Sequence, residues 1–203
     1  GKKIVRPKGQ SDSSRLDQSI HSRLMEDNLD LITAVVSMMP PAWENDPSLS
    51  AEVRAMLEYF SLYEEKNDGP AALIFGNGEV IGARLDRLGL RPLRSVETAE
   101  YIGAMSEAGQ IAFPPESVLR RGRIEAGGML YYDHREKRSY TTLEALEKLA
   151  AVADYPALLA QSRVTLEELP VIPAEQQGSP LRYSGDLKTY QRFVAYYYNQ
   201  ESF

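Results

Sequence analysis

The sequence predicts an α+β fold in which antiparallel strands occupy the middle of the chain and helices lie before and after them. Three observations predict it. Apolar residues recur at helical spacing between residues 14 and 66, two β-prone runs flank an Asn-Gly pair at 77–78, and the helical pattern returns from Leu143. Because strands joined by short turns pair antiparallel, antiparallel sheets are expected.

Two helices are predicted before residue 40. The first covers residues 14–27, where leucine and isoleucine recur every four residues behind the Ser-Asp-Ser-Ser cluster at 11–14, which can cap it. The second covers the apolar segment 29–39. It is expected to end before Pro40, because the residue that precedes a proline avoids the α-helical conformation.

A third helix is predicted over residues 51–66. Ser50 precedes an amphipathic spacing of apolar residues, and Glu52 would lie in the first helical turn. The loop before this helix contains the only tryptophan, Trp43, whose ring is expected to be buried.

A β-hairpin forms the centre of the predicted sheet structure. Its strands are the apolar runs 71–75 and 80–85, and the Asn-Gly pair between them favours a type I′ turn, which requires positive φ at both central positions. The second run leads directly into a charged block that contains Asp86, Arg87 and Arg91. We expect these charged side chains to form a buried ion pair at the end of the strand.

Further strands are predicted after the hairpin, with a loop through Pro114 and Pro115 between them, and two helices follow. The segment 170–180 contains three prolines and a glycine, which is typical of a linker. Residues 1–178 are therefore predicted to form one domain, and residues 179–203 the helical start of a second. The four strands are expected at residues 93–97, 101–106, 129–133 and 137–141, and the helices from Leu143 and Pro156.

The composition excludes several classes of protein. The chain of 203 residues has a formal net charge of −6, so it carries no overall basic field for nucleic acid. No apolar run approaches the roughly 18 to 20 residues of a membrane span, and the first ten residues lack the apolar core of a secretion signal. A cytoplasmic protein without a nucleic-acid or membrane partner is expected. Because the chain starts without methionine and stops within a helical pattern, it is expected to be part of a longer polypeptide.

Catalysis by this chain alone is not predicted. There is no cysteine, which excludes disulfides, thiolate metal sites and a cysteine nucleophile. The two histidines, His21 and His134, are far apart and are expected on the surface, so no metal site is predicted. The cluster Ser11-Asp12-Ser13 allows two interpretations from the residues alone: a helix cap, or a polar loop that presents Asp12 to the ammonium group of a ligand.

Several blocks of residues stand out, in this order along the chain: 11–14 with 16–17, 41–47, 68–72, 85–92, 106–107 and 114–116. Together these blocks resemble the large subunit of glutamate synthase, in the second half of its class II glutamine amidotransferase domain of the N-terminal nucleophile hydrolase type. The resemblance implies a four-layer α-β-β-α sandwich with antiparallel sheets. After the linker, the tail resembles the start of the central domain of that family.

The resemblance implies roles for seven residues. Asp12 would bind the α-ammonium group of glutamine, and Ser11 and Ser13 would fix its loop. The nucleophile of the family is an N-terminal cysteine, and an asparagine-glycine pair upstream of the serine-aspartate block forms the oxyanion hole. Neither is present here, so the isolated chain is expected to be inactive, with no catalytic residue of its own. The positions expected to give structural support are Asp86, Arg91, Ser106 and Glu107.

In the parent enzyme, the resemblance implies, ammonia from glutamine reacts with 2-oxoglutarate in a synthase domain that contains FMN and an iron-sulfur cluster. Both cofactors are expected to bind outside this chain. The expected partners are glutamine, the rest of the large subunit and a nicotinamide-dependent small subunit.

Two alternatives remain open. One is a degenerate amidotransferase that serves as an interaction or structural module, and the other is a separately encoded half domain that completes a second chain. In the four-layer architecture the missing half would contribute strands to both sheets. The isolated chain would then have bare sheet edges, so self-association or poor solubility is expected.

Overall fold

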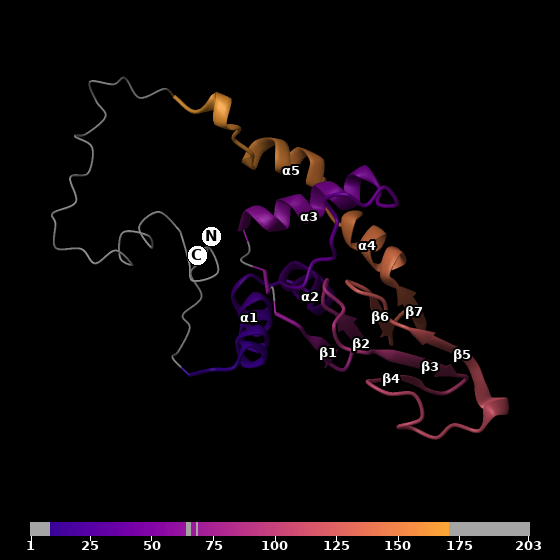
Figure 1. Cartoon of the computed structure of the whole chain (residues 1–203). Coiled ribbons are helices and arrows are strands. Elements are labelled where there is room, and N and C mark those ends of the chain that lie inside the picture. Colours follow the sequence, from indigo (N-terminus) through magenta and orange to yellow (C-terminus); the bar gives the residue numbers. More distant parts are fainter. Residues whose placement is uncertain (1–8, 64–65, 68, 171–203) are drawn as a thin grey trace. The chain divides into compact units, whose positions relative to one another are not determined.

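A computed structural model describes residues 9–63, 66–67 and 69–170, and Figure 1 shows the path of the chain. The described residues up to 163 form one compact unit, and those from 164 belong to a second, of which the 3-10 helix η2 (Leu166–Glu168) is described. The predicted boundary between residues 178 and 179, the predicted helical start of a second domain at 179–203, and most of the linker lie outside the described residues.

Helices lie before and after the strands, as predicted. The first three begin and end within three residues of their predicted limits, and residues 64–65, at the expected end of the third, lie outside the described part. Trp43 is half-buried and packs against the helical core, so the burial predicted for its ring is partial. The helices are α1 (Asp12–Glu26), α2 (Leu31–Met38), α3 (Ala51–Tyr63), α4 (Thr142–Ala150) and α5 (Tyr155–Ser162).

The strands form two antiparallel sheets, which confirms the predicted α+β class with antiparallel sheets. Sheet A has the strand order β1-β2-β6-β7, and sheet B has the order β4-β3-β5. Because β2 pairs with β6, the three strands between them are diverted into the second sheet, and the strands do not form one continuous meander. The strands are β1 (Ala72–Gly76), β2 (Val80–Leu85), β3 (Arg94–Thr98), β4 (Ile102–Met105), β5 (Val118–Arg123), β6 (Met129–Asp133) and β7 (Arg138–Thr141).

The strand β5, which follows the 3-10 helix η1 (Pro115–Ser117), was not predicted. Its sequence Val-Leu-Arg-Arg-Gly-Arg contains three arginines and a glycine and lacks the alternation of apolar and polar residues by which a strand is recognised. The strand forms because its backbone pairs with β3 from Arg94 to Thr98. Tertiary pairing therefore decided this element.

The β1–β2 hairpin is present, but its turn differs from the predicted type I′. Gly78 has a φ of 87°, and Asn77 does not have a positive φ, so the prediction of positive φ at both positions was wrong. The side-chain oxygen of Asn77 instead accepts the backbone N–H groups of Glu79 and Val80, each at 3.0 Å. The turn is held by the asparagine side chain.

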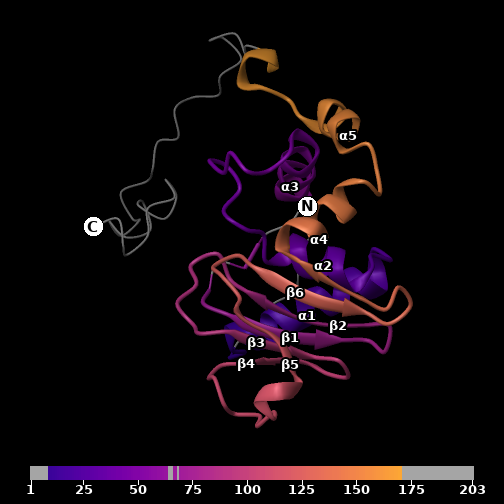
Figure 2. The same cartoon turned by 90° about the vertical axis from the view of Figure 1, so that its right-hand side faces the viewer.

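Two hydrophobic cores define the layers. On one face of sheet A, Phe75 and Tyr131 pack against the helices, and Figure 2 shows α2, α3 and α4 on the same side of the strands. On the other face, Ala83 and Leu130 pack against Leu93 and residues of sheet B. The described residues thus form three layers in the order helices, sheet A, sheet B. The fourth layer, a second set of helices beyond sheet B, is not found among them.

The longest described helix, α1, has 15 residues. Within the described ranges, none of the helices combines the length and the apolar character that crossing a bilayer requires.

Candidate functional site

At the N-terminus of α1, the residue that caps the helix and the acidic residue are two different residues. Ser11 has an extended backbone conformation and is the N-cap, and its side-chain oxygen accepts the N–H of Ser14 at 3.3 Å. Asp12 is the first helical residue, and its side chain is 80% exposed. In the described part of the chain its polar contact is with Arg15, where Nη1 lies 3.5 Å from Oδ1. The carboxylate of Asp12 is therefore not used as the helix cap.

The surroundings of Asp12 favour a negative charge that can bind a cation. The unpaired N–H groups of the first helical turn create a partial positive charge that stabilises a carboxylate there. The hydroxyl groups of Ser11 and Ser13 lie 3.0 Å apart and hold the chain at this point. A carboxylate with free lone pairs can accept charge-assisted hydrogen bonds from an ammonium group.

Gly69 places the segment that leads into β1 beside Asp12. A Cβ atom added at Gly69 would lie 4.0 Å from the Cβ of Asp12. The carbonyl oxygen of Gly69 accepts a hydrogen bond from the side-chain amide of Asn67 at 3.1 Å, and the backbone N–H of Asn67 donates to the carbonyl of Met38 at 2.9 Å. We call this segment, residues 69–71, the wall beside Asp12. It is therefore held to the C-terminal end of α2 by hydrogen bonds.

Asp86 supports the same wall from the end of β2. Its side chain is buried, and Oδ2 accepts the N–H of Ala71 at 3.0 Å. Oδ1 accepts the N–H groups of Leu88 at 2.9 Å and Gly89 at 3.1 Å. Backbone N–H groups thus pair with both oxygens of the buried carboxylate. Arg91, one of the two arginines expected to form a buried ion pair in this block, is exposed, so a buried pair with Arg91 was a wrong prediction.

Ser106 and Glu107, the other predicted supporting residues, lie in the loop that follows β4 on sheet B. Both are exposed, and Ser106 accepts a hydrogen bond from the side chain of Gln110 at 3.1 Å. Within the described residues, no hydrogen bond or ion pair joins them to Asp86. The structure therefore brings Asp12 and the wall supported by Asp86 together and places Ser106 and Glu107 elsewhere.

Sequence reasoning missed a buried arginine that connects β2 to the end of α2. Arg84 of β2 is fully buried, and its Nε and Nη2 donate to the carbonyl of Met39, at the end of α2, at 3.0 Å and 2.5 Å. Burial lowers the pKa of Arg84 to about 10, although the nearby charge of Glu125 acts in the opposite direction. A positive charge at a helix C-terminus is favourable, which explains why this charge is tolerated in the core. The only signal for the burial of Arg84 was its position in a central strand, on the face that packs against the helices.

The two histidines are exposed, as predicted. The described residues include no cluster of histidine and carboxylate side chains that could hold a metal ion.

Comparison with known proteins identifies the relatives of this chain. The model of the family "Glutamine amidotransferases class-II" matches residues 3–158. The large chain of the NADPH glutamate synthase of Bacillus subtilis is 36% identical over 189 residues, which are 93% of this chain and 12% of that protein.

Glutamate synthases that use other electron donors match as well. The ferredoxin-dependent enzyme of Pyropia yezoensis is 33% identical over 177 residues, 86% of this chain and 11% of that protein. The NADH enzyme of Schizosaccharomyces pombe is 32% identical over 163 residues, 80% of this chain and 8% of that protein. The chain therefore spans only 8 to 12% of the length of these relatives.

Proposed function

We propose that this chain, which belongs to the class II glutamine amidotransferase family and resembles the amidotransferase domain of glutamate synthases, supplies the part of a glutaminase domain that binds the α-ammonium group of glutamine. The exposed carboxylate of Asp12, next to a helix cap supplied by Ser11, is the observation that carries the proposal.

The polar contacts around Asp12 support this role. A free ammonium group has three N–H donors and requires acceptors with free lone pairs. The ion pair with Arg15 joins Nη1 to Oδ1 at 3.5 Å, and Gly69 lies next to the Cβ atom of Asp12. A glycine there keeps the approach open, because any larger residue would add atoms next to the carboxylate.

Hydrolysis would require residues from outside these 203. The chain contains no cysteine, and the family uses a cysteine thiolate to attack the side-chain amide. The isolated chain is therefore proposed to bind one end of glutamine without releasing ammonia. The nucleophile and the donors of the oxyanion hole would come from another segment of the same protein or from a partner chain.

The proposed reaction of the complete enzyme is that of the glutamate synthases that this chain resembles. Ammonia from glutamine would reach a synthase domain and react with 2-oxoglutarate, with FMN and an iron-sulfur cluster held elsewhere. The composition agrees with this division, because cluster ligands are cysteines and this chain has none. The other proposed partners are the remainder of the large subunit and a nicotinamide-dependent small subunit.

A structural or interaction module is the second candidate, and one observation favours it. Ile74 and Ile81 lie on the same face of sheet A as Ala83 but are 54% and 41% exposed, so sheet B leaves this end of the face uncovered. Exposed apolar residues beside an edge strand suit a surface that another segment covers.

The test of the ammonium role is Asp12→Asn in the enzyme that contains this domain. We expect the KM for glutamine to rise by about tenfold or more, because a charge-assisted hydrogen bond is lost, while ammonia-dependent glutamate formation is unchanged. Asp17→Asn, at an exposed position on the same helix, is the control and should leave both activities unchanged. An unaltered KM for glutamine in the Asp12 variant would exclude the proposed role.

A further inference from the structure

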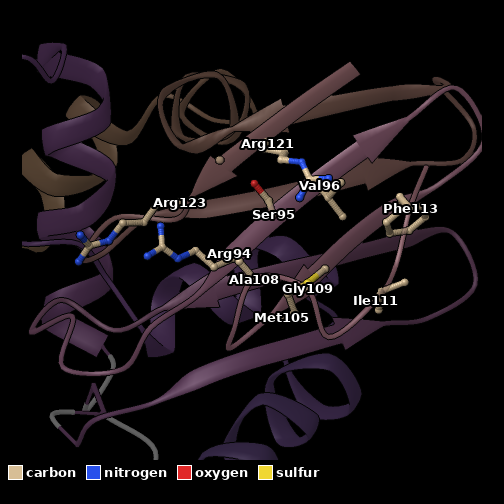
Figure 3. Close-up of a pocket in the computed structure, with 11 residues that line it drawn as sticks. Arg94, Ser95, Val96, Met105, Ala108, Gly109, Ile111, Phe113, Arg121 and Arg123 are labelled. Atoms are coloured by element: carbon tan, nitrogen blue, oxygen red, sulfur yellow. The ribbon is translucent and has the colours of Figure 1, made fainter. Parts of the chain in front are cut away.

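A cavity of about 400 Å³ lies on the outer face of sheet B, where Figure 3 shows it lined by side chains of β3, β5 and the loop after β4. The four-layer architecture that the resemblance implies would place a layer of helices over this face. The cavity would then be filled by another part of the complete protein. The segment beside Asp12, between α3 and β1, has a different kind of opening.

Asn67 holds this segment through its backbone and through its side chain. Its backbone N–H donates to the carbonyl of Met38 at 2.9 Å, and its Nδ2 donates to the carbonyl of Gly69 at 3.1 Å. A carbonyl oxygen only accepts, so the side-chain atom that faces Gly69 is the nitrogen, and the other atom of the amide is the oxygen. In the part of the chain that the structure describes, this oxygen, Oδ1, has no hydrogen-bond partner.

The side chains of Asn67 and Asp12 flank one small space. Gly69 leaves this space open, because a Cβ atom added there would lie 3.8 Å from Oδ1 of Asn67 and 4.0 Å from the Cβ of Asp12. Asn67 is half-buried, and the side chain of Asp12 is 80% exposed. A ligand group that reaches Asp12 beside Gly69 would therefore also come close to the amide oxygen of Asn67.

The two acceptors differ in charge, and together they suit an ammonium group. The carboxylate of Asp12 balances a single positive charge, whereas the amide oxygen of Asn67 accepts a hydrogen bond without adding a second negative charge. An ammonium group has three N–H donors, and one carboxylate leaves at least one of them without an acceptor. The amide oxygen can accept that remaining N–H.

We propose that Oδ1 of Asn67 is a second acceptor for the α-ammonium group of glutamine, which would lie beside Gly69 between Asn67 and Asp12. This inference rests on the proposed function, in which Asp12 binds the same group. With two acceptors directed at one ammonium group, a ligand that lacks this group would leave both of them unpaired. Asn67 would therefore contribute to selectivity for the free α-amino group.

The test compares two substrates in the complete enzyme that contains this domain. Glutaramate is glutamine without its α-amino group, so it cannot form the proposed hydrogen bond. We expect Asn67→Ala to lower kcat/KM for ammonia release from glutamine by about tenfold, because a hydrogen bond to a charged group is lost. The kcat/KM for glutaramate should change by less than about twofold, since a tenth of the original value would require a lost contact of its own.

Two further variants accompany Asn67→Ala. Gln18→Ala removes an exposed amide side chain from α1 and should leave both kcat/KM values unchanged. Gly69→Ala places a methyl group in the open space without strain, because the nearest atoms are at 3.8 Å or more. It should raise the KM for glutamine by about tenfold, by displacing the ammonium group from its acceptors. Circular dichroism establishes that each variant is folded.

The outcomes separate a ligand role from a structural one. If Asn67→Ala lowers kcat/KM for both substrates by the same factor, Asn67 only holds the segment in place, and the inference is overturned. Unchanged use of glutamine in Asn67→Ala or in Gly69→Ala also overturns it. If Asp12→Asn impairs the use of glutamine and Asn67→Ala does not, this inference alone fails, whereas unchanged KM values for glutamine in both variants refute the proposed function as well.

Discussion

Asp86 and Ala71 form a reciprocal pair of hydrogen bonds between the end of β2 and the residue before β1. The carboxylate of Asp86 accepts the N–H of Ala71 at 3.0 Å, and the N–H of Asp86 donates to the carbonyl of Ala71 at 2.9 Å. Gly69, two residues before Ala71, lies against Asp12. The position of the wall beside Asp12 therefore depends on a buried carboxylate that does not itself face the proposed ligand.

Asp86→Asn should destabilise the fold. An amide group can accept with only one of its two heteroatoms, so either Ala71 or the Leu88–Gly89 bend would lose its acceptor. We expect the free energy of unfolding to fall by about 1 to 3 kcal/mol, measured by urea unfolding. Asp17→Asn, an exposed aspartate, should change it by less than about 0.5 kcal/mol. Equal stability of the two variants would show that the buried hydrogen bonds contribute little.

Gly82→Ala should also destabilise the fold, through crowding. A Cβ atom at Gly82 would lie 2.6 Å from both the ring of Phe75 and the Cβ of Tyr131, which occupy the neighbouring strands. Moving these buried side chains is expected to cost about 1 to 3 kcal/mol in unfolding free energy. The control is Gly69→Ala, where the nearest atoms are at 3.8 Å or more and no strain is expected. A Gly82 variant as stable as the control would contradict this packing.

Tyr131 should make the fold less stable at alkaline pH. Burial raises the pKa of Tyr131 to about 12, from an ordinary value of 10. Between pH 10 and pH 12 the unfolded chain loses this proton while the folded chain retains it, so rising pH favours the unfolded state. The contribution of Tyr131 to the free energy of unfolding should therefore fall by roughly 2 kcal/mol across that range.

Tyr131→Phe removes the titrating group and isolates this effect. Urea unfolding of both proteins at pH 8 and pH 11.5 should show a smaller loss of stability in the phenylalanine variant. Parallel losses in the two proteins would mean that the phenol of Tyr131 ionises as readily in the folded state as in the unfolded state.

The isolated chain should self-associate. Among the described strands, β1 and β4 each have a neighbour on one side only, and Ile74 and Ile81 expose apolar surface beside β1. Sedimentation velocity should detect dimers or larger species whose proportion grows with concentration. Ile74→Lys would place a charge at the exposed position and should shift the distribution toward monomer. A monodisperse wild-type monomer with little dye-accessible apolar surface would argue against an uncovered face.

The residues that sequence reasoning located best lie in locally specified elements. The Ser-Asp-Ser-Ser cluster predicted a cap for the first helix, and Ser11 caps α1 by accepting the N–H of Ser14, three positions further along the chain. The strand β6 matches its predicted range, 129–133, because its apolar run is bounded by glycine and a polar turn. The sequence left open whether Asp12 caps the helix or remains available, and the backbone conformation assigned the cap to Ser11.

The sequence by itself determined the helices, the hairpins, the antiparallel α+β class and the family, because periodicity, capping residues and turn residues act over a few positions along the chain. Only the tertiary structure decided that β5 is a strand, that Arg84 is buried on the end of α2, and that Arg94 faces Arg123 across sheet B. These features depend on contacts between residues 20 to 45 positions apart in the chain. Such contacts are set by packing and strand register, which no local pattern of residues encodes.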